Sequence, residues 1–423
     1  MSDTDDSVDQ IEAVAANGLL HRRAFLKTGA LVTGGATFLS AQAAPPEVDA
    51  WSTVPGRPPE AYGNRSDFES DVLRTPGFSP PALGAGASRT PHGSLEGMIT
   101  PSALHFERHH NGIPNIDPDE HRLLIHGLVD RPLIFDLETL SRYPLVSRIQ
   151  FLECSGNSRL LDADQPVDGS AQSIHGLLSC SEWTGVPLSI LLDEAVIQTE
   201  GMWVLAEGAD SSLMTRSIPM SKVRDDAIIA LYQNGERLRP GNGYPMRLFL
   251  PGWEGNTSVK WLRRIKVTEA PTMTRDETSK YSDLRPDGSA QLFSFQMGVK
   301  SIITSPSGQQ TMRGPGLYQI SGLAWTGAGR ISRVEVSADG GRSWGDAELS
   351  GPVLSKALTR FRMPWRWNGG PALIQSRAYD ETGAVQPTRT ALISQRGTQY
   401  NYHNHAIQTW QVSSNGEVSN VYS

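Results

Sequence analysis

Alternating apolar and polar positions dominate the middle of the chain and predict a series of short strands. The runs lie at 122–129, 148–152, 204–210 and 227–236, and this alternation is typical of strands with one buried face. The last run contains Asn234-Gly235, a strong signal for a two-residue hairpin turn. The run from 189 to 195 has helical spacing instead, with Ser189 as its expected cap.

A second pattern begins near residue 288, where short alternating runs return at regular intervals. They lie at 299–304, 316–325, 331–337 and 372–380, and turns such as 338–341 separate them. Regularly spaced strands of this kind predict a β-sandwich. The predicted fold class is therefore α+β, with a mixed domain over 99–287, a β-sandwich domain over 288–411 and a tail over 412–423.

The start of the chain looks like a targeting segment. Residues 1–20 are acidic and polar, an unlikely start for a folded domain, and Arg22-Arg23 precedes an uncharged stretch over 28–40 and an Ala-Gln-Ala site at 41–43. This order predicts a twin-arginine export signal over 1–43 and a mature protein that reaches the periplasm already folded. The alternative is a basic patch before a buried helix. The apolar stretch is too short to span a membrane.

Residues 44–98 are rich in Pro, Gly, Arg and Ser and have little periodicity. We expect an extended arm over the surface, of a kind that can lie on a partner subunit. The arginines of the arm are expected to be solvated or paired with nearby acids; they are Arg57, Arg65, Arg74 and Arg89.

Composition excludes several classes of protein. A net charge of −7 argues against nucleic-acid binding, which requires a basic face. Two cysteines exclude a disulfide scaffold and a cysteine zinc cluster, and no Cys-x-x-Cys-His is present to attach a c-type haem to this chain. His105, His109 and His110 suggest a metal site, but Gly112 and Pro114 prevent a helix from presenting them on one face. His403 and His405 are predicted to lie on one face of an edge strand, as structural or surface residues.

One cysteine lies where ligands usually bind. The apolar run 148–152 leads directly into Glu153-Cys154-Ser155-Gly156-Asn157-Ser158-Arg159, which is a turn or the start of a helix. A cysteine at a strand-to-turn junction presents its sulfur at a sheet edge, and Arg159 adds a fixed positive charge nearby. The alternative is a half-buried structural cysteine paired with Cys180.

Two cations occur in strongly apolar surroundings. Arg247 follows a proline turn into a predicted buried strand, and Lys260 lies between Val259 and Trp261. Because a buried cation needs an anionic partner, a cofactor phosphate is a natural candidate for both.

The cysteine loop and the stretch Gly-Tyr-Pro-Met-Arg…Leu-Pro-Gly…Val-Lys-Trp-Leu resemble the sulfite oxidase family of molybdenum enzymes, over about 100–410. The resemblance implies a sulfite-oxidase-type molybdopterin domain, an immunoglobulin-like dimerisation domain, and a molybdenum ion bound by Cys154 and the pterin dithiolene. His109 and Asn242 replace an asparagine and a histidine of the family pattern. The implied cofactor-binding residues are Phe106, Arg108, His109, His110, Cys154, Ser155, Asp210, Asn242, Arg247, Ser258, Val259 and Lys260.

The resemblance also implies catalytic residues and partners. Arg108, Arg159 and Arg396 are expected to form a cationic pocket, since guanidinium groups bind sulfur oxyanions bidentately. Tyr281 matches the family's active-site tyrosine, although the residues 277–280 separate it from Arg275-Asp276. The implied partners are a dihaem c-type cytochrome subunit, which accepts the electrons, and a second copy bound through the C-terminal domain, giving a heterotetramer.

Within the family, the features resemble the molybdenum subunits of sulfane dehydrogenases in bacterial thiosulfate oxidation. These enzymes oxidise, by oxo transfer, a sulfane sulfur on a carrier-protein cysteine. Where the family has a pocket tryptophan, this chain has polar residues near Ser173, so we expect a pocket wider than a sulfite-only site. The alternatives are a dehydrogenase of free sulfite, a sulfoxide reductase on the same fold, and a non-enzymatic secreted protein with a Cys154–Cys180 disulfide.

Overall fold

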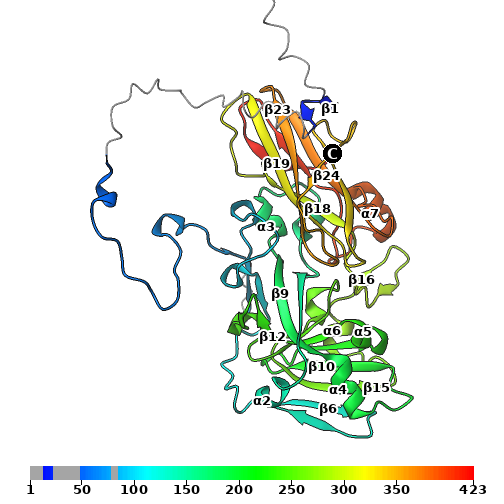
Figure 1. Cartoon of the computed structure of the whole chain (residues 1–423). Helices are drawn as coiled ribbons and strands as arrows, with labels where there is room; N and C mark the ends of the chain where they lie inside the picture. The colour runs from blue at the N-terminus through cyan, green and yellow to red at the C-terminus, as the bar shows by residue number, and fades with distance from the viewer. Residues whose placement is uncertain (1–12, 22–47, 78–83) are drawn as a thin grey trace, which may run out of the picture.

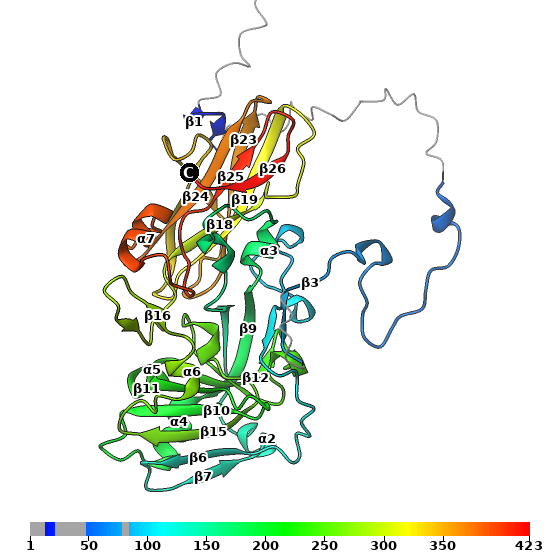
Figure 2. The same cartoon turned by 180° about the vertical axis from the view of Figure 1, so that it is seen from behind.

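The computed structural model describes residues 13–21, 48–77 and 84–423. The predicted twin-arginine pair, Arg22-Arg23, and the cleavage site at 41–43 lie outside the described residues. Figures 1 and 2 show two β-rich bodies arranged end to end, the first largely cyan and green and the second yellow to red. None of the described helices is long and apolar enough to cross a membrane.

The first body contains two five-stranded sheets. One has the order β11-β10-β15-β6-β7, in which β15 and β6 run parallel and the other pairs are antiparallel. The other has the order β13-β12-β9-β8, with β14 also paired to β12. The strands are β6 Leu123–Gly127, β7 Leu133–Phe135, β8 Val146–Glu153, β9 Leu178–Pro187, β10 Trp203–Gly208, β11 Thr215–Pro219, β12 Ile228–Gln233, β13 Glu236–Arg237, β14 Arg247–Phe249 and β15 Leu262–Thr268.

The predicted hairpin at Asn234-Gly235 is confirmed. Both residues have a positive φ, 51° and 82°, and Gln233 pairs with Glu236 across the turn. These are the backbone angles that a tight two-residue turn requires and that asparagine and glycine adopt readily.

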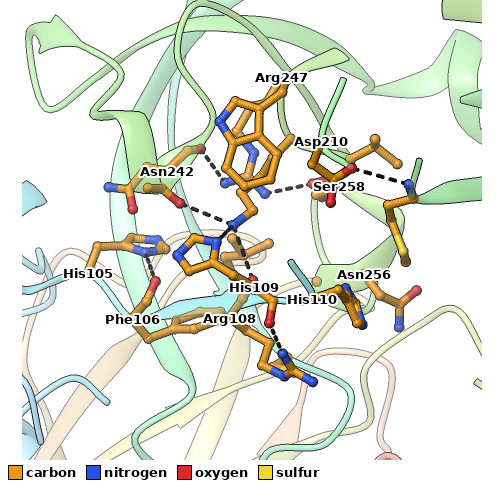
Figure 3. A pocket seen from close by; sticks show the side chains of 18 of the residues that line it. His105, Phe106, Arg108, His109, His110, Asp210, Asn242, Arg247, Asn256 and Ser258 are labelled. Atoms are coloured by element: carbon orange, nitrogen blue, oxygen red, sulfur yellow. Dashed lines mark hydrogen bonds between the residues drawn. The ribbon is translucent and has the colours of Figure 1, made fainter. Parts of the chain in front are cut away.

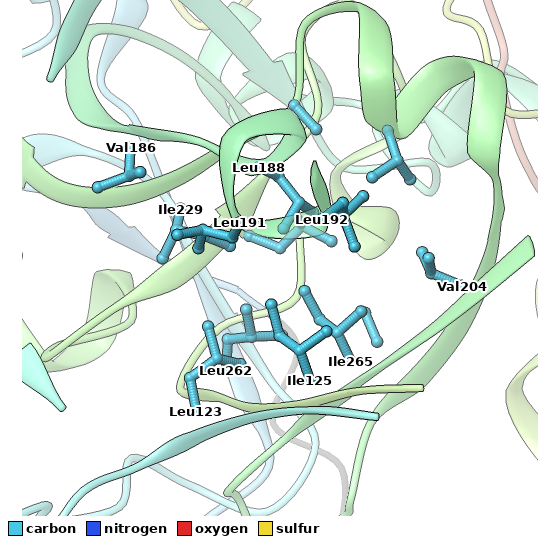
Figure 4. Close-up of a cluster of buried hydrophobic side chains, with 14 of the residues drawn as sticks. Leu123, Ile125, Val186, Leu188, Leu191, Leu192, Val204, Ile229, Leu262 and Ile265 are labelled. Atoms are coloured by element: carbon cyan, nitrogen blue, oxygen red, sulfur yellow. The ribbon is translucent and has the colours of Figure 1, made fainter. Parts of the chain in front are cut away.

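The apolar core of the first body lies between its sheets and two short helices, α4 Leu188–Ala195 and α5 Met220–Asp225. Figure 4 shows Leu188, Leu191 and Leu192 packed over side chains from the strands. Burial of each leucine stabilises the fold by roughly 1.5–3 kcal/mol. The predicted cap at Ser189 is wrong: the helix begins one residue earlier, after Pro187, and has no side-chain cap, because β9 leads straight into it.

The second body is the predicted β-sandwich. One sheet has the order β1-β2-β23-β19-β18, with β22 on β23, and the other has the order β21-β20-β24-β25-β26. The expected runs 316–325, 331–337 and 372–380 form β19, β20 and β24. The strands are β18 Lys300–Ser305, β19 Gly316–Trp325, β20 Ile331–Ser337, β21 Gly345–Asp346, β22 Glu348–Leu349, β23 Thr359–Trp367, β24 Ala372–Asp380, β25 Thr409–Val412 and β26 Val418–Val421. Because β26 pairs with β25, residues assigned to a tail complete the sandwich.

The start of the chain departs from the expectation for residues 1–20. β1 Ala13–Ala15 and β2 Leu19–Leu20 form a hairpin that extends the first sandwich sheet through the pair Leu19–Trp365. Leu19 is fully buried in the sandwich core, and the Trp365 indole donates a 2.8 Å hydrogen bond to the Asn17 carbonyl. A local reading of acidic and polar composition misses this hairpin, because its apolar partners lie more than 300 residues away.

From 48 to 74 the arm contains no strand and only two short 3-10 helices, Ala50–Ser52 and Asp67–Glu69, and Figures 1 and 2 show it running out from the body before β3 joins the fold. β3 Thr75–Pro76, β4 Gly86–Arg89 and β5 Glu107–His109 form a small sheet. Arg57 and Arg74 pair with acids, Asp67 and Glu107, as expected. Arg89 does not follow that expectation: it is half-buried and lines a cavity described below.

Candidate active site

Cys154 lies at the point where the two bodies meet. It follows the last residue of β8, Glu153, whose buried carboxylate accepts hydrogen bonds from Lys300 (3.1 Å) and from the Trp325 indole (2.7 Å) of the sandwich. The Asn157 side chain donates to the same carboxylate at 2.9 Å. Strand end, loop and sandwich are thus fixed together around the cysteine.

Cys154 and Cys180 are both free thiols. Cys180 is fully buried in an apolar cluster, opposite Phe151 in the β8–β9 ladder, and burial raises its pKa to about 12. Burial also raises the pKa of the Cys154 thiol, while the backbone N–H of Gly156 and the charge of Arg108 lower it. The alternative of a Cys154–Cys180 disulfide is therefore not found in this structure.

An inner pocket opens next to Cys154 and collects most of the predicted cofactor-binding residues (Figure 3). It is lined by side chains from the β5 region, from the Pro240–Asn242 turn, from β14 and from the loop before β15. The predicted residues that line it are Phe106, Arg108, His109, His110, Cys154, Asp210, Asn242, Arg247, Ser258, Val259 and Lys260.

Lys260 and Arg247 are the buried cations of this pocket. The Lys260 ammonium contacts His109 Nδ1 at 2.8 Å and donates to the carbonyls of Arg108 and Gly241 at 3.2 and 3.1 Å. The Arg247 guanidinium donates to the carbonyls of Asn242 (2.9 Å) and Ser258 (2.7 Å), and its Nε has no partner.

Burial lowers the pKa of Lys260 well below its usual value, and that of Arg247 to about 9. Among the described contacts, neither cation pairs directly with a carboxylate. A buried donor without an acceptor and two uncompensated cations fit an anionic cofactor, and a thiolate at Cys154 fits a soft metal ion.

A wider outer cavity, about 940 Å³ against about 80 Å³ for the inner pocket, opens on the other side of Cys154. Four residues line both spaces, namely Arg108, His110, Cys154 and Tyr281. Three further cations line the outer cavity, namely Arg89, Arg159 and Lys280, and its far wall is the segment 398–402 of the second body. The Arg159 side chain is exposed, and no hydrogen bond or ion pair of its guanidinium is found among the described residues. The outer cavity is therefore a cationic space that opens onto the cysteine.

The backbone of Tyr281 has a strained conformation at the site. Its φ is 51°, a left-handed conformation that is costly for an aromatic residue and that the surrounding structure must enforce. Its hydroxyl is 3.2 Å from His110 Nε2, and the Arg216 guanidinium carbon is 5.0 Å from its ring centroid. Burial raises the Tyr281 pKa, so the hydroxyl remains a hydrogen-bond donor at neutral pH.

Three predicted residues lie outside the inner pocket: Arg159, which lines the outer cavity, Ser155 and Arg396. Ser155 borders the outer cavity, and its hydroxyl accepts from Asn256 at 2.9 Å. Arg396 ends helix α7 Arg389–Arg396 and lines neither space; its guanidinium donates to the carbonyls of Tyr402 and His403 at 3.2 and 3.3 Å. Arg396 thus contacts the backbone of the segment that walls the outer cavity.

The prediction of an edge strand at 403–405 is wrong. Residues 401–407 have no regular strand structure, and His403 is buried, with its Nε2 3.2 Å from the Glu254 carboxylate. No group of three or more ligand-type side chains suited to a metal ion occurs among the described residues, which includes His105, His109 and His110.

Sequence reasoning missed four residues around the site: Arg89, Arg216, Glu254 and Asn256. Their contacts join segments far apart in the chain, and a buried polar network has no periodic signature. The sequence offers one signal for two of them: Glu254 and Asn256 lie just before the Ser-Val-Lys-Trp stretch that carries the family resemblance.

Comparisons with known proteins agree with this geometry. An oxidoreductase molybdopterin binding domain matches residues 110–275, and a Mo-co oxidoreductase dimerisation domain matches residues 292–410. The crystal structure of the sulfane dehydrogenase SoxCD from Paracoccus pantotrophus superposes with a TM-score of 0.86 at 46% identity, over 89% of this chain and 98% of that chain.

Curated relatives include sulfite oxidase of Gallus gallus, 30% identical over 80% of this chain and 79% of that protein. NADH nitrate reductase of Ulva prolifera is 30% identical over 71% of this chain, and human sulfite oxidase is 31% identical over 64%. The chain spans 39% and 52% of the length of these last two proteins. The inner pocket, with its free cysteine and buried cations, suits the molybdenum–molybdopterin cofactor of these enzymes. The chain therefore belongs to the sulfite oxidase family of molybdopterin-dependent oxidoreductases.

Proposed function

We propose that this enzyme oxidises a sulfane sulfur carried on the cysteine of a carrier protein. The observation that carries the proposal is the outer cavity, which leads from the surface to Cys154 and is lined by cations. The 46% identity to a sulfane dehydrogenase over 98% of that chain supports it. Free sulfite is the alternative substrate, and the similarity to sulfite oxidases favours it.

The width of the outer cavity supports a substrate larger than sulfite. Near Ser173 the described side chains that reach the cavity are Ile174 and Leu177, and no tryptophan lines it. A cavity of about 940 Å³ can admit an extended arm that bears a sulfur atom, whereas sulfite needs only a small anion site. A carrier-bound substrate also requires an opening at the surface, and the exposed Arg159 lies at such an opening.

The residues of the chain then have the following roles. The residues that would hold the pterin are Phe106, His109, Asp210, Asn242, Arg247, Ser258, Val259 and Lys260, and Cys154 would bind the molybdenum. Arg108 and Arg159 bind and orient the oxygen atoms of the sulfur group, because a planar guanidinium matches an oxyanion bidentately. Tyr281 donates a hydrogen bond at the reacting centre, and His110 orients its hydroxyl. The bound cofactor supplies a two-electron oxidation of sulfur, with water as the source of the oxygen.

The position of Arg396 suggests an indirect role. By holding the carbonyls of Tyr402 and His403, it fixes the segment that forms the far wall of the cavity. We therefore include it as a positioning residue that acts through this segment.

The proposed setting is the periplasm, with export by the twin-arginine pair at 22–23. Cleavage at 41–43 would remove the β1–β2 hairpin, which then belongs to the uncleaved chain alone. Electrons would pass singly to a c-type dihaem cytochrome subunit, and the second body would bind a second copy of the chain. The matched dimerisation domain and the SoxCD complex support these partners.

The test uses the full chain, produced in a host that makes molybdopterin. Wild type is expected to contain close to one molybdenum per chain and to reduce cytochrome c faster with protein-bound sulfane than with sulfite. Cys154→Ser should lose turnover, while Cys180→Ala, a matched change in the apolar core, should keep both metal and turnover. Faster oxidation of free sulfite would favour the alternative substrate, and a wild-type protein without molybdenum would overturn the proposal.

A further inference from the structure

A buried network of charged side chains lies beneath the proposed active site. Glu254, Arg216, Glu277 and His403 are each at most 2% exposed, and they come from separate parts of the chain. Burial of so many charges costs free energy unless each has a partner. A network of this kind next to Cys154, the proposed metal ligand, therefore indicates a role beyond stability.

Glu254 is the centre of this network. Its backbone pairs with that of Glu153, which precedes Cys154, and its N–H donates to the Phe295 carbonyl at 2.7 Å. Its carboxylate accepts hydrogen bonds from Asn256 (2.7 Å) and Arg216 (3.4 Å) and lies 3.2 Å from His403 Nε2. One carboxylate thus contacts side chains from both bodies.

Two branches lead from Glu254 to the loop of Cys154. Asn256 donates to the Ser155 hydroxyl at 2.9 Å, and the His403 backbone N–H donates to the Ser155 carbonyl at 2.8 Å. Both groups are fixed by Glu254, so the residue next to the metal ligand is fixed on two sides. A third branch runs through Arg216, whose guanidinium lies 5.0 Å from the Tyr281 ring centroid.

We propose that Glu254 is a positioning residue, which couples the C-terminal body to the Cys154 loop and orients Arg216 against Tyr281. The inference rests on the proposed function, because it gives Tyr281 a role at the reacting centre. Glu254 lines neither the inner pocket nor the outer cavity, and none of the described hydrogen bonds of its carboxylate reaches Cys154.

The negative charge of Glu254 gives its proposed positioning role an effect that can be measured. Arg216 is flanked by two carboxylates, Glu254 and Glu277, whose oxygens lie 3.4 and 3.7 Å from its nitrogens. Replacement of Glu254 by glutamine removes one negative charge and leaves the shape nearly unchanged. The local potential becomes more positive, which favours the reduced form of a nearby metal and raises its reduction potential.

The control is a second buried carboxylate of the same body. Glu207 is 5% exposed and binds the guanidinium groups of Arg263 and Arg264. It lines neither the inner pocket nor the outer cavity. Glu207→Gln therefore removes the charge of a buried carboxylate, here paired with partly exposed arginines, without touching the network.

The experiment compares Glu254→Gln and Glu207→Gln in the molybdenum-loaded full chain. We expect both to melt at a lower temperature and to retain the metal. Only Glu254→Gln should show a raised molybdenum potential in an EPR-monitored titration. Its kcat should fall by about 10²–10³ with KM nearly unchanged, which is the cost typical of one misplaced electrostatic group. His403→Gln breaks the same link from the other body without removing a negative charge, so it is expected to lower kcat by a smaller factor and not to raise the potential.

A wild-type kcat in both Glu254→Gln and His403→Gln, together with a wild-type potential in Glu254→Gln, would overturn the inference and leave Glu254 as a structural ion pair. If Glu254→Gln does not fold, His403→Gln alone decides between the two outcomes. Failure of the proposed function looks different, since the loaded wild type would then oxidise neither sulfite nor protein-bound sulfane, whatever the potentials.

Discussion

At the scale of single residues, the site depends on cations that the fold leaves without anions of its own. Lys260 and Arg247 donate to backbone carbonyls, which satisfy hydrogen bonds but not charge. Their role could be predicted because each lies in an apolar run of sequence, where a cation is rare. Glu254 and Arg216 could not be predicted, since their partners are fixed only by the folded chain.

Lys260→Met is expected to lower molybdenum content and to change how stability depends on pH. Burial lowers the pKa of Lys260 in the folded chain well below 10.5. Between these two pKa values the unfolded chain binds the extra proton, so the contribution of Lys260 to stability rises with pH. The variant lacks this contribution. In denaturant unfolding of cofactor-free protein, the free energy of unfolding of wild type should therefore rise relative to that of Lys260→Met as the pH approaches 10.5. Parallel pH profiles of the two proteins would contradict the prediction.

At the scale of elements, alternation located the strands that have one buried face. β19, β20 and β24 have the predicted bounds. β23 was not predicted, because Pro364 interrupts an alternating run and proline usually argues against an interior strand. The hairpin of β1 and β2 and the segment around His403 were also missed, since distant partners determine both.

The attachment of the β1–β2 hairpin to the sandwich can be tested by adding one methyl group at Gly18. Gly18 has a φ of +88°, and a Cβ at this position would lie 2.0 Å from the Arg366 carbonyl oxygen. Gly18→Ala should therefore detach the hairpin and expose Leu19, at a cost of about 1–3 kcal/mol. Amide hydrogen exchange of residues 13–20 in the full chain measures the effect. Gly56→Ala, where no atom lies within 4 Å, is the control; unchanged protection in Gly18→Ala would show that the hairpin does not need this close approach.

At the scale of the whole molecule, the site is a product of two bodies. Cys154 and the inner pocket belong to the first, while the far wall of the outer cavity and the anchors of Glu153 belong to the second. The resemblance identified both bodies and the cofactor from motifs. The resemblance did not show how the two bodies contact each other, because their interface consists of long-range contacts between buried polar groups.

Lys300 provides the sharpest test of this coupling. Its ammonium is 1% exposed and donates to Glu153 (3.1 Å), to the Ser158 hydroxyl (2.6 Å) and to the Asn404 carbonyl (2.7 Å), so one side chain connects both ends of the cysteine loop to the second body. Lys300→Met leaves the Glu153 carboxylate buried without its cation, which typically costs about 3–5 kcal/mol. We expect a lower midpoint in denaturant and reduced molybdenum content.

The matched control is Lys356→Met. Lys356 pairs with Asp226 of the first body at 2.6 Å, yet it is 20% exposed and distant in sequence from the cysteine loop. Because the buried Asp226 keeps its second cation, Lys222 at 2.6 Å, loss of Lys356 should cost less than loss of Lys300 and leave the metal content unchanged. If Lys300→Met and Lys356→Met destabilise the chain equally and both retain molybdenum, the contact with Glu153 only joins the two bodies. If metal is lost in Lys300→Met alone, the second body determines the geometry of the metal ligand in the first.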